Sequence, residues 1–285
     1  MLNPKLNILV AYPYLSSPII KRLKDFDIKY PNTLRFFLDS GAFTAHNSGK
    51  IISVDQYCSF LDSLPIRPWR YIALDAIGNE AKTKKNYELM LSRGYSPVPV
   101  YTQGADWSDV EYYYSTSDFI CFGGLVGKKG SGLVINAIDK FLAIANGRKS
   151  HLLGYTSVPY LKKFKPYSCD SSSWESGARF GTVPVYLQQG KMLNLDKKKI
   201  INNPSGEVKK ALRAMDVDME KIKSLEGWTG GDSEIRKTCA KSWVRLSVDI
   251  EKNLGTKLFL ALATDHALKL IINAYESQIL TRLKR

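Results

Sequence analysis

Two aspartates that each follow a short apolar run are the residues best suited to chemistry in this chain. Arg-Phe-Phe-Leu precedes Asp39, and Tyr-Ser-Cys precedes Asp170. Two carboxylates in one partly desolvated site can divide roles, one staying ionised as a nucleophile while the other exchanges protons. That division suits a reaction at a sugar anomeric carbon, where a carboxylate captures an oxocarbenium-like centre. The alternative interpretation of either aspartate is a helix cap.

Further polar and glycine residues end other apolar runs in the same way. Asp75 and Gln103 suit a guanine-like edge, because a carboxylate accepts N–H bonds and an amide both donates and accepts. Gly123 and Gly124 let backbone groups approach a ligand closely. The alternative for these four residues is a surface turn. Three aromatic residues are candidates for stacking on a planar base, although aromatics near strand ends often belong to the core: Phe43, Tyr101 and Tyr155.

Residues at the ends of successive strands need a scaffold that brings those ends together. Apolar runs bounded by Gly, Asp and Ser predict buried strands, at about 7–12, 35–39, 71–75, 97–102, 119–123, 151–154, 167–170 and 182–187. Helical patterns between several of them predict parallel pairing, and eight strands favour closure. We therefore expect an α/β fold, a (β/α)8 TIM barrel that is irregular after the sixth strand, with its site at the carboxyl ends of the strands.

Helix signals support this layout. Ser53 and Gln56 form a capping-box pattern before residues 57–64, and a helical stretch at 79–93 stops at Gly94. Residues 133–145 form another amphipathic run. Beyond residue 190, helices are expected at 207–225, 233–254 and 258–283, of which the first completes the barrel. The expected domains are a barrel at 1–226 and a basic helical C-terminal element at 227–285.

Composition excludes several classes of protein. The chain has 285 residues, 44% hydrophobic and 24% charged, which suits one barrel with a large core. No stretch approaches 18 apolar residues and no signal-peptide core opens the chain, so we expect no membrane span and a cytoplasmic location. The cysteines lack metal-ligand spacing and the histidines are scattered in sequence. We expect reduced structural thiols, no metal and no cofactor.

The net charge of +14 indicates a polyanionic partner. Residues 1–190 hold 22 Lys and Arg against 15 Asp and Glu, and residues 191–285 hold 19 against 12, so each part carries +7. The charge density is therefore doubled in the shorter part. A merely basic, solvated surface is the alternative. Lysine clusters favour nucleic acid, and the expected contacts are Lys162, Lys163, Lys165, Lys197, Lys198 and Lys199.

Taken in order, these motifs resemble the tRNA-guanine transglycosylase superfamily. The resemblance covers roughly residues 35–175 and rests on Asp39-Ser40-Gly41-Ala42-Phe43, Leu74-Asp75, Gln103-Gly104, Gly123-Gly124-Leu125-Val126-Gly127, Leu153-Gly154 and Asp170. It implies that Asp170 is the nucleophile and that Asp39 is the acid/base group. It also implies a base-binding set of Asp75, Gln103, Gly123, Gly124, Leu125, Ser40, Gly41, Phe43 and Gly154.

The departures from that family concern the nucleic acid. The tRNA enzymes carry a CxCxxC-plus-His zinc site after the barrel strands, and this shorter chain has none. It looks more like the compact DNA-modifying branch of bacteriophages, for which the location is the host cytoplasm. The run Ser171-Ser172-Ser173-Trp174 is also similar to that branch. The resemblance implies replacement of guanine in DNA by a 7-deazaguanine through a covalent aspartyl-glycosyl intermediate.

Three alternatives remain open from the sequence. The same exchange on tRNA, of the queuosine or archaeosine type, would require a 2′-OH. A non-catalytic nucleic-acid-binding subunit would keep the barrel without forming a covalent adduct. An unrelated barrel enzyme would use Gly123 and Gly124 for a small phosphate ester, and nucleic acid would then not compete with its substrate.

Overall fold

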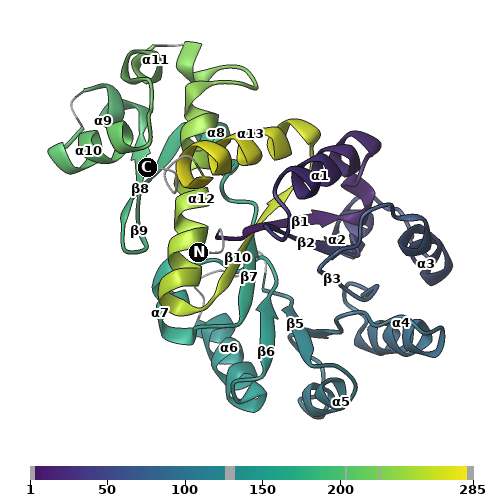
Figure 1. Ribbon diagram of the computed structural model, residues 1–285. Coiled ribbons are helices and arrows are strands. Elements are labelled where there is room, and N and C mark those ends of the chain that lie inside the picture. Colours follow the sequence, from purple (N-terminus) through teal and green to yellow (C-terminus); the bar gives the residue numbers. More distant parts are fainter. Residues whose placement is uncertain (1–3, 126–131, 203, 225, 281–285) are drawn as a thin grey trace.

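Eight parallel strands form one curled sheet at the centre of the molecule (Figure 1). The computed structural model describes residues 4–125, 132–202, 204–224 and 226–280. The strands of this sheet are β1 (Leu6–Ala11), β2 (Leu34–Asp39), β3 (Arg70–Tyr71), β4 (Val100–Thr102), β5 (Phe119–Gly123), β6 (Lys149–Leu152), β7 (Ser168–Ser171) and β10 (Lys257–Leu262). Their order is β3-β2-β1-β10-β7-β6-β5-β4. This arrangement confirms the expected fold class.

The two edge strands, β3 and β4, are the irregular part of the sheet. An isolated parallel bridge between Ile72 and Val98 joins them and closes the sheet into a (β/α)8 barrel. The bridge is short because Pro97 and Pro99 flank Val98, and proline has no backbone N–H for a ladder. The irregularity therefore lies between the third and fourth strands, and not after the sixth strand as the sequence suggested.

Helices cover the outside of the barrel (Figure 1). They are α1 (Ser17–Lys29), α3 (Val54–Ser63), α4 (Glu80–Ser92), α5 (Ser108–Thr116), α6 (Gly132–Ala145), α7 (Val158–Phe164), α12 (Glu234–Leu254) and α13 (Asp265–Tyr275). Short segments η1 (Tyr12–Tyr14) and α2 (Ala42–Asn47) follow β1 and β2. The capping box is confirmed: Gln56 N donates to Ser53 Oγ at 3.1 Å, and Ser53 N donates to Gln56 Oε1 at 3.0 Å. None of the described helices is long and apolar enough to cross a membrane.

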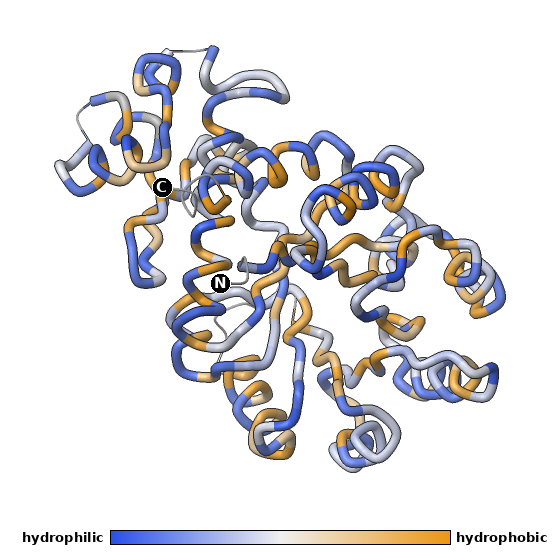
Figure 2. The backbone as a smooth tube through the Cα atoms, in the orientation of Figure 1, coloured by the Kyte–Doolittle hydropathy of each residue, from blue (hydrophilic) through white to orange (hydrophobic). Residues whose placement is uncertain are grey.

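Alternation along the strands divides the apolar residues between two cores. One core fills the barrel interior and includes Phe37, Cys121 and Phe259. The other lies between the sheet and the helices, and Figure 2 shows apolar strands at the centre with hydrophilic stretches on the outer helices. Because side chains on a strand point to opposite faces in turn, a polar residue two positions after an interior residue also faces the interior. That rule places Asp39 and Asp170 inside the barrel.

The eighth strand of the barrel differs from the one expected. Residues 182–187 do form a strand, β8 (Thr182–Gln188), but it pairs antiparallel with β9 (Lys191–Asp196) outside the barrel. The barrel strand is β10, where a helix at 258–283 was expected; that helix begins only at α13. The reason is that a short apolar run such as residues 258–262 has the same pattern in a buried strand and in a helix. Thr264 then caps α13, because its Oγ1 accepts from Ala267 N at 3.1 Å.

A small subdomain interrupts the barrel between β7 and α12. This insert comprises α8 (Ser176–Phe180), β8, β9, α9 (Lys197–Ile201), α10 (Gly206–Ala214), α11 (Met219–Lys223) and η2 (Glu226–Trp228). It has a hydrophobic core of its own, which includes Val185, Leu212 and Ile222. The expected helix at 207–225 is therefore two helices of the insert, broken at Asp216, where φ is 54°. A division at residue 226 does not separate the barrel from the rest, because β10 pairs with β1 and β7.

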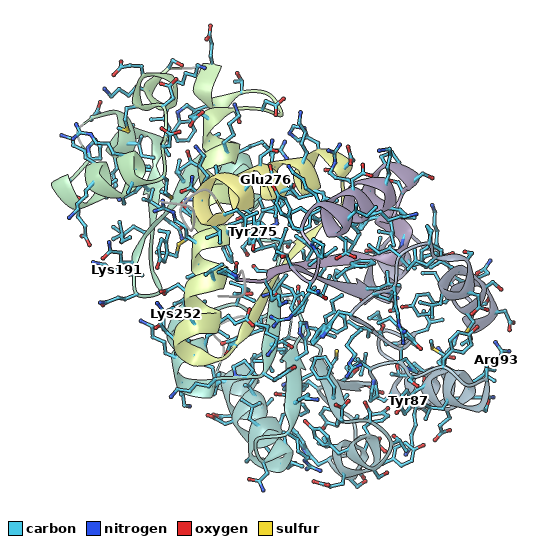
Figure 3. The ribbon with its side chains drawn as sticks, in the orientation of Figure 1. Tyr87, Arg93, Lys191, Lys252, Tyr275 and Glu276 are labelled. Carbon is cyan, nitrogen blue, oxygen red and sulfur yellow. The ribbon has the colours of Figure 1, made fainter. Side chains whose placement is uncertain are left out.

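Hydrogen bonds join the C-terminal segment of the described chain to its N-terminal segment. Figure 3 labels Tyr275 and Glu276, which make these bonds. Glu276 Oε1 accepts from Lys29 Nζ at 2.8 Å and from the Tyr30 hydroxyl at 2.9 Å. Tyr275 donates to the carbonyl of Pro4. Glu276 begins a short π-helical turn, η3 (Glu276–Leu280), which continues α13. The last segment of the described chain thus belongs to the barrel and not to a separate element.

Candidate active site

Three aspartates meet at the carboxyl ends of the barrel strands. Asp39 is the last residue of β2, Asp170 lies in β7, and Asp75 follows β3. Burial raises the pKa of Asp39, and the charges of Asp75 and Asp170 add to this effect. Together they bring the pKa to about 7. Burial also raises the pKa of Asp75. Because the carboxyl groups repel one another and are partly removed from water, one of them can hold a proton near neutral pH.

The backbone around Asp39 is shaped by one glycine. The N–H groups of Ser40 and Gly41 hydrogen-bond to the Asp39 carboxyl and oppose the rise in its pKa. Gly41 has φ of +75°, and a Cβ at this position would lie 2.1 Å from Pro13 Cδ. Only glycine fits this turn, which directs the chain from β2 into α2. Gly41 therefore positions Asp39 through the backbone, since it has no side chain to touch a ligand.

Asp170 is held by one carboxylate oxygen. Its Oδ1 accepts from Gly154 N at 2.6 Å and lies 3.2 Å from Nε2 of His151. Among the described residues, Oδ2 receives no hydrogen bond. Asp170 is 8% exposed, so the carboxylate is fixed in the barrel and one oxygen is free for a ligand.

Sequence reasoning missed His151, which is fully buried beneath Asp170. Its Nδ1 lies 2.9 Å from Ser168 Oγ, and β6 and β7 pair so that His151 stands opposite Ser168. The alternation of Ser168 and Asp170 on one face of β7 was visible in the sequence. The register that adds His151 was not, because pairing between strands is a property of the folded sheet.

Asp75 is anchored by the residue that follows Asp39. Ser40, which is fully buried, donates from Oγ to Asp75 Oδ1 at 2.9 Å. Asn86 Nδ2 donates to the carbonyl of Leu74 at 3.0 Å and holds the end of the strand. A cavity of about 280 Å³ opens beside Asp75, and its lining includes His46, Lys50 and Lys82. Asp75 therefore borders a space with basic side chains at its rim.

Gln103 carries a buried acceptor that has no partner among the described residues. Its backbone N donates to Gly123 O at 3.2 Å, whereas its side-chain Oε1 is enclosed and receives no bond. Buried polar atoms are nearly always paired, so this oxygen is available to accept a hydrogen bond from a ligand or a water molecule. Gly124 lies against Gln103 with φ of +78°. Leu125 is buried, and Val126 and Gly127 lie outside the described residues.

The aromatic candidates divide into one that can meet a ligand and two that cannot. Phe43 is 51% exposed on α2, whereas Tyr101 and Tyr155 are 1% exposed in the core between sheet and helices. Other large apolar side chains are also exposed in segments that follow barrel strands. These exposed rim residues are Tyr14, Phe43, Ile51, Ile77, Leu133 and Phe180. Such a rim suits unstacked bases, which present apolar faces.

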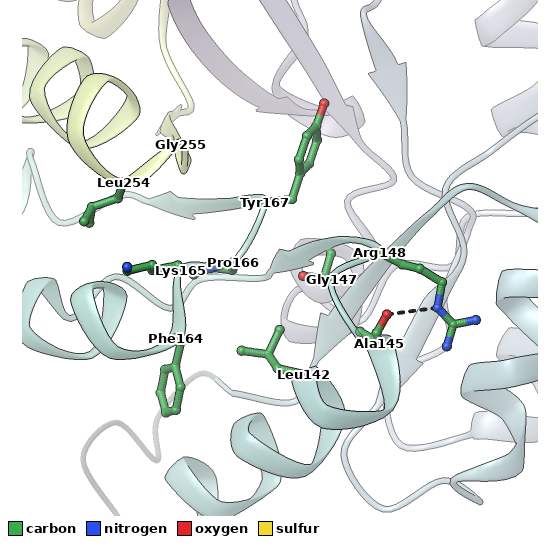
Figure 4. Close-up of a pocket in the computed structure, with 11 residues that line it drawn as sticks. Leu142, Ala145, Gly147, Arg148, Phe164, Lys165, Pro166, Tyr167, Leu254 and Gly255 are labelled. Carbon is green, nitrogen blue, oxygen red and sulfur yellow. Dashed lines mark hydrogen bonds between the residues drawn. The ribbon is translucent and has the colours of Figure 1, made fainter.

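The expected nucleic-acid lysines lie in different places. Lys163 is paired with Asp139 at 2.7 Å, and Lys162 Nζ donates to Gln189 O at 3.3 Å. Lys165 ends α7 and lines a cavity of about 280 Å³ at the amino-terminal end of the barrel, shown in Figure 4. Lys198 and Lys199 are exposed on α9 of the insert, and the side chain of Lys197 lies outside the described residues. Of the expected lysines whose side chains are described, Lys198 and Lys199 lie on the insert, where Lys199 Nζ is 3.4 Å from Asp196 Oδ2.

The cavity in Figure 4 does not contribute to the aspartate site. Its lining residues precede β6, β7 and β10, apart from Ser150 near the start of β6, so the cavity lies at the opposite end of the parallel strands. Arg148, at its edge, is engaged by Glu111 at 2.6 Å. Within the part of the chain that the structure describes, no three His, Cys, Asp or Glu residues are grouped to hold a metal ion.

No protein-family model matches the chain, and no curated protein matches it. The site itself holds a fixed carboxylate with one free oxygen, a second carboxyl with a pKa of about 7, a third carboxyl bonded to Ser40, and a buried amide oxygen without a partner among the described residues.

Proposed function

We propose that this protein is a base-exchange transglycosylase that replaces guanine in DNA with a 7-deazaguanine. The observation that carries the proposal is that Asp170 and Asp39 lie in one site. Asp170 is fixed through Oδ1 with Oδ2 open, and Asp39 has a pKa raised to about 7 by burial and by its acidic neighbours. A fixed nucleophile and a proton-holding carboxyl in one site match the requirements of two-step displacement at an anomeric carbon.

The proposed reaction begins with attack on the sugar. Asp170 Oδ2 bonds to C1′ of a deoxyguanosine while the bond from C1′ to the guanine nitrogen breaks, and the electron pair leaves with the base. Asp39, protonated below about pH 7, gives its proton to the departing guanine. In the second step Asp39 removes a proton from the incoming 7-deazaguanine, whose nitrogen attacks C1′. The ester breaks and Asp170 returns to its carboxylate form.

The guanine ring is proposed to lie between Asp75 and Gln103. Asp75 keeps one oxygen on Ser40 at 2.9 Å and has the other for N–H groups of the base. The unpaired Oε1 of Gln103 supplies a second acceptor, and the absence of a side chain at Gly124 allows the ring to approach the backbone. A duplex base reaches this site only after it leaves the stack, and the exposed rim residues support that unpaired state.

Asp75→Ala is expected to weaken binding of free guanine by about 1–3 kcal/mol, because the N–H groups of the bound base lose their acceptor. Isothermal titration calorimetry with guanine measures this change. Asp25→Ala is the matched control, since Asp25 is an exposed aspartate on α1. An unchanged dissociation constant in Asp75→Ala would remove this residue from the base site.

DNA is proposed as the substrate in preference to tRNA because the chain lacks the CxCxxC-plus-His motif of the tRNA enzymes. The direct experiment incubates the protein with labelled guanine and, separately, with single-stranded DNA, duplex DNA and tRNA. Label is expected to enter DNA. Label in tRNA alone would overturn the choice of substrate. Binding without any incorporation would instead favour the non-catalytic subunit.

Charge reversal is expected to map the path of the DNA backbone. Each phosphate contact contributes about −0.9 to the slope of log K against log salt on duplex DNA. Reversal of Lys198 and Lys199, or of Lys50 and Lys82, should therefore shallow the slope by about 2 when both lysines touch phosphate. Lys21 and Lys24 on the outer helix α1 form the matched pair.

Fluorescence anisotropy at several salt concentrations gives the salt slope of the wild type and of each of the three double variants. Calorimetry with free guanine checks that the base site is unchanged. The pair that shallows the slope identifies the contacting surface. Slopes equal to the wild type in both test pairs would show that these lysines are only solvated.

A further inference from the structure

His151 is a buried titratable residue that the proposed reaction does not use. It lies inside the barrel with no exposed surface, and its ring packs edge-on against Phe37, with ring centroids 5.0 Å apart. Both ring nitrogens have partners: Nδ1 lies 2.9 Å from Ser168 Oγ, and Nε2 lies 3.2 Å from Asp170 Oδ1. Ser168, His151 and Asp170 thus form a chain of polar contacts in the apolar interior, which ends at the proposed nucleophile.

The partners of the ring determine which nitrogen carries hydrogen toward Asp170. An ionised carboxylate only accepts hydrogen bonds, so Nε2 must be the donor to Oδ1. The Ser168 hydroxyl can donate or accept and adapts to Nδ1. In a neutral ring, the hydroxyl of Ser168 donates to Nδ1 and thereby selects the tautomer with hydrogen on Nε2.

We propose that His151 is a positioning residue that aims Oδ2 of Asp170 at the sugar, with Ser168 fixing the tautomer of the ring. The inference rests on the proposed transglycosylation, because only that reaction gives Oδ2 a target. The terminal rotation of an aspartate is broad when nothing holds it. Two N–H donors on Oδ1, from Gly154 at 2.6 Å and from His151, restrict that rotation and leave Oδ2 as the reacting atom.

The arrangement fits both states of Asp170 in the reaction. When Oδ2 becomes the bridging oxygen of the glycosyl ester, Oδ1 becomes the ester carbonyl and still accepts hydrogen bonds. Gly154 and His151 therefore keep their acceptor before and after the bond to C1′ forms. A donor on Oδ2 would instead have to be displaced. Holding a nucleophile through the atom that does not react is preorganisation, and misplacement by about 1 Å can cost about 10²-fold in rate.

The test compares variants that keep or remove the donor. His151→Gln places an amide N–H near the position of Nε2, whereas His151→Phe fills the space without a donor. We expect His151→Phe to lower kcat for base exchange by about 10²-fold with little change in KM for guanine, and His151→Gln to recover most of that loss. Ser168→Ala should fall between them. His266→Phe is the control, because His266 is a half-buried histidine bonded to Gly231 O at 2.7 Å outside the aspartate site.

A second readout does not depend on activity. The chain has three histidines, so ¹⁵N spectra of the ring nitrogens are readily assigned with His151→Gln as the reference. In the wild type, His151 is expected to show the Nε2–H tautomer alone. In Ser168→Ala, His151 is expected to show a mixture of the two tautomers. This measurement also covers the case in which His151→Phe fails to fold.

The outcomes separate the two proposals. A ring that carries hydrogen on Nδ1, or a folded His151→Phe with kcat within threefold of the wild type, would overturn the positioning role. The same is true if His151→Gln loses as much activity as His151→Phe. If the wild-type protein exchanges no base on any nucleic acid while His151 is the Nε2–H tautomer, the proposed function fails, and the positioning role fails with it.

Discussion

Asp170→Asn is expected to reduce base exchange by about 10⁴-fold or more while the protein stays folded and still binds nucleic acid. The amide oxygen of asparagine can take the place of Oδ1 and accept from Gly154 and His151, as the carboxylate does. The amide nitrogen then stands where Oδ2 was and cannot attack C1′. The variant therefore removes the reacting atom and keeps the hydrogen bonds that hold residue 170.

Two measurements check this expectation. Incorporation of labelled guanine reports the exchange, and denaturing electrophoresis after mixing with DNA reports the covalent adduct, which should be present in the wild type and absent in the variant. Asp25→Asn on α1 is the matched control, because Asp25 is exposed and pairs along its own helix with Lys21 at 2.7 Å. Exchange at near wild-type rates in Asp170→Asn would remove Asp170 from the role of nucleophile.

Much of the candidate site was predictable because a parallel barrel brings one end of every strand together. Each of Asp39, Asp75 and Asp170 ends an apolar run, and the structure places Asp75 and Asp170 close enough to Asp39 for their charges to raise its pKa. This prediction needed only the positions of strand ends, and not the pairing of strands. The error in the bounds of the third strand, expected at residues 71–75 and observed as β3 (Arg70–Tyr71), therefore did no harm.

Features that depend on tertiary context were not predictable in the same way. The run at 258–262 is equally apolar in a helix and in a buried strand, and only its pairing with β1 and β7 decides between them. His151 faces Asp170 through the register of two strands. Tyr101 and Tyr155 end on the outer face of the sheet, where an aromatic side chain is part of the core. Charge clusters in sequence do not reveal partners, as Lys163 with Asp139 shows.

Asp39→Asn is expected to stabilise the protein at neutral and alkaline pH and to lower the rate of base exchange. The folded state raises the pKa of Asp39 from 3.8 to about 7, so between these values the folded protein holds a proton that the unfolded chain releases. The contribution of Asp39 to stability is therefore complete below about pH 4 and is lost as pH rises through 7. This difference between the pKa of the unfolded and the folded state corresponds to about 4 kcal/mol in the free energy of unfolding. Asparagine cannot ionise, so the variant escapes this loss.

Denaturant unfolding at pH 4, 6 and 8 measures the effect. The difference in free energy of unfolding between Asp39→Asn and wild type should grow from near zero at pH 4 to about 4 kcal/mol at pH 8. Asp265→Asn is the control of opposite sign. Arg22, bonded to Asp265 at 2.7 Å, lowers the pKa of that carboxyl. The contribution of Asp265 to stability is therefore present above about pH 4 and lost in acid, so Asp265→Asn should be less stable than wild type at pH 8.

The combination of results distinguishes a functional carboxyl from a structural one. A structural aspartate resembles Asp265: its charge is stabilised by the fold, and its removal costs stability. Asp39 instead lies where burial and two other carboxyl groups oppose its charge, an arrangement that is suited to proton transfer near neutral pH. Loss of the proton-transferring group should lower exchange by about 10²–10⁴-fold in Asp39→Asn. Greater stability with unchanged exchange would show that Asp39 is merely strained, and the acid/base role would then pass to Asp75.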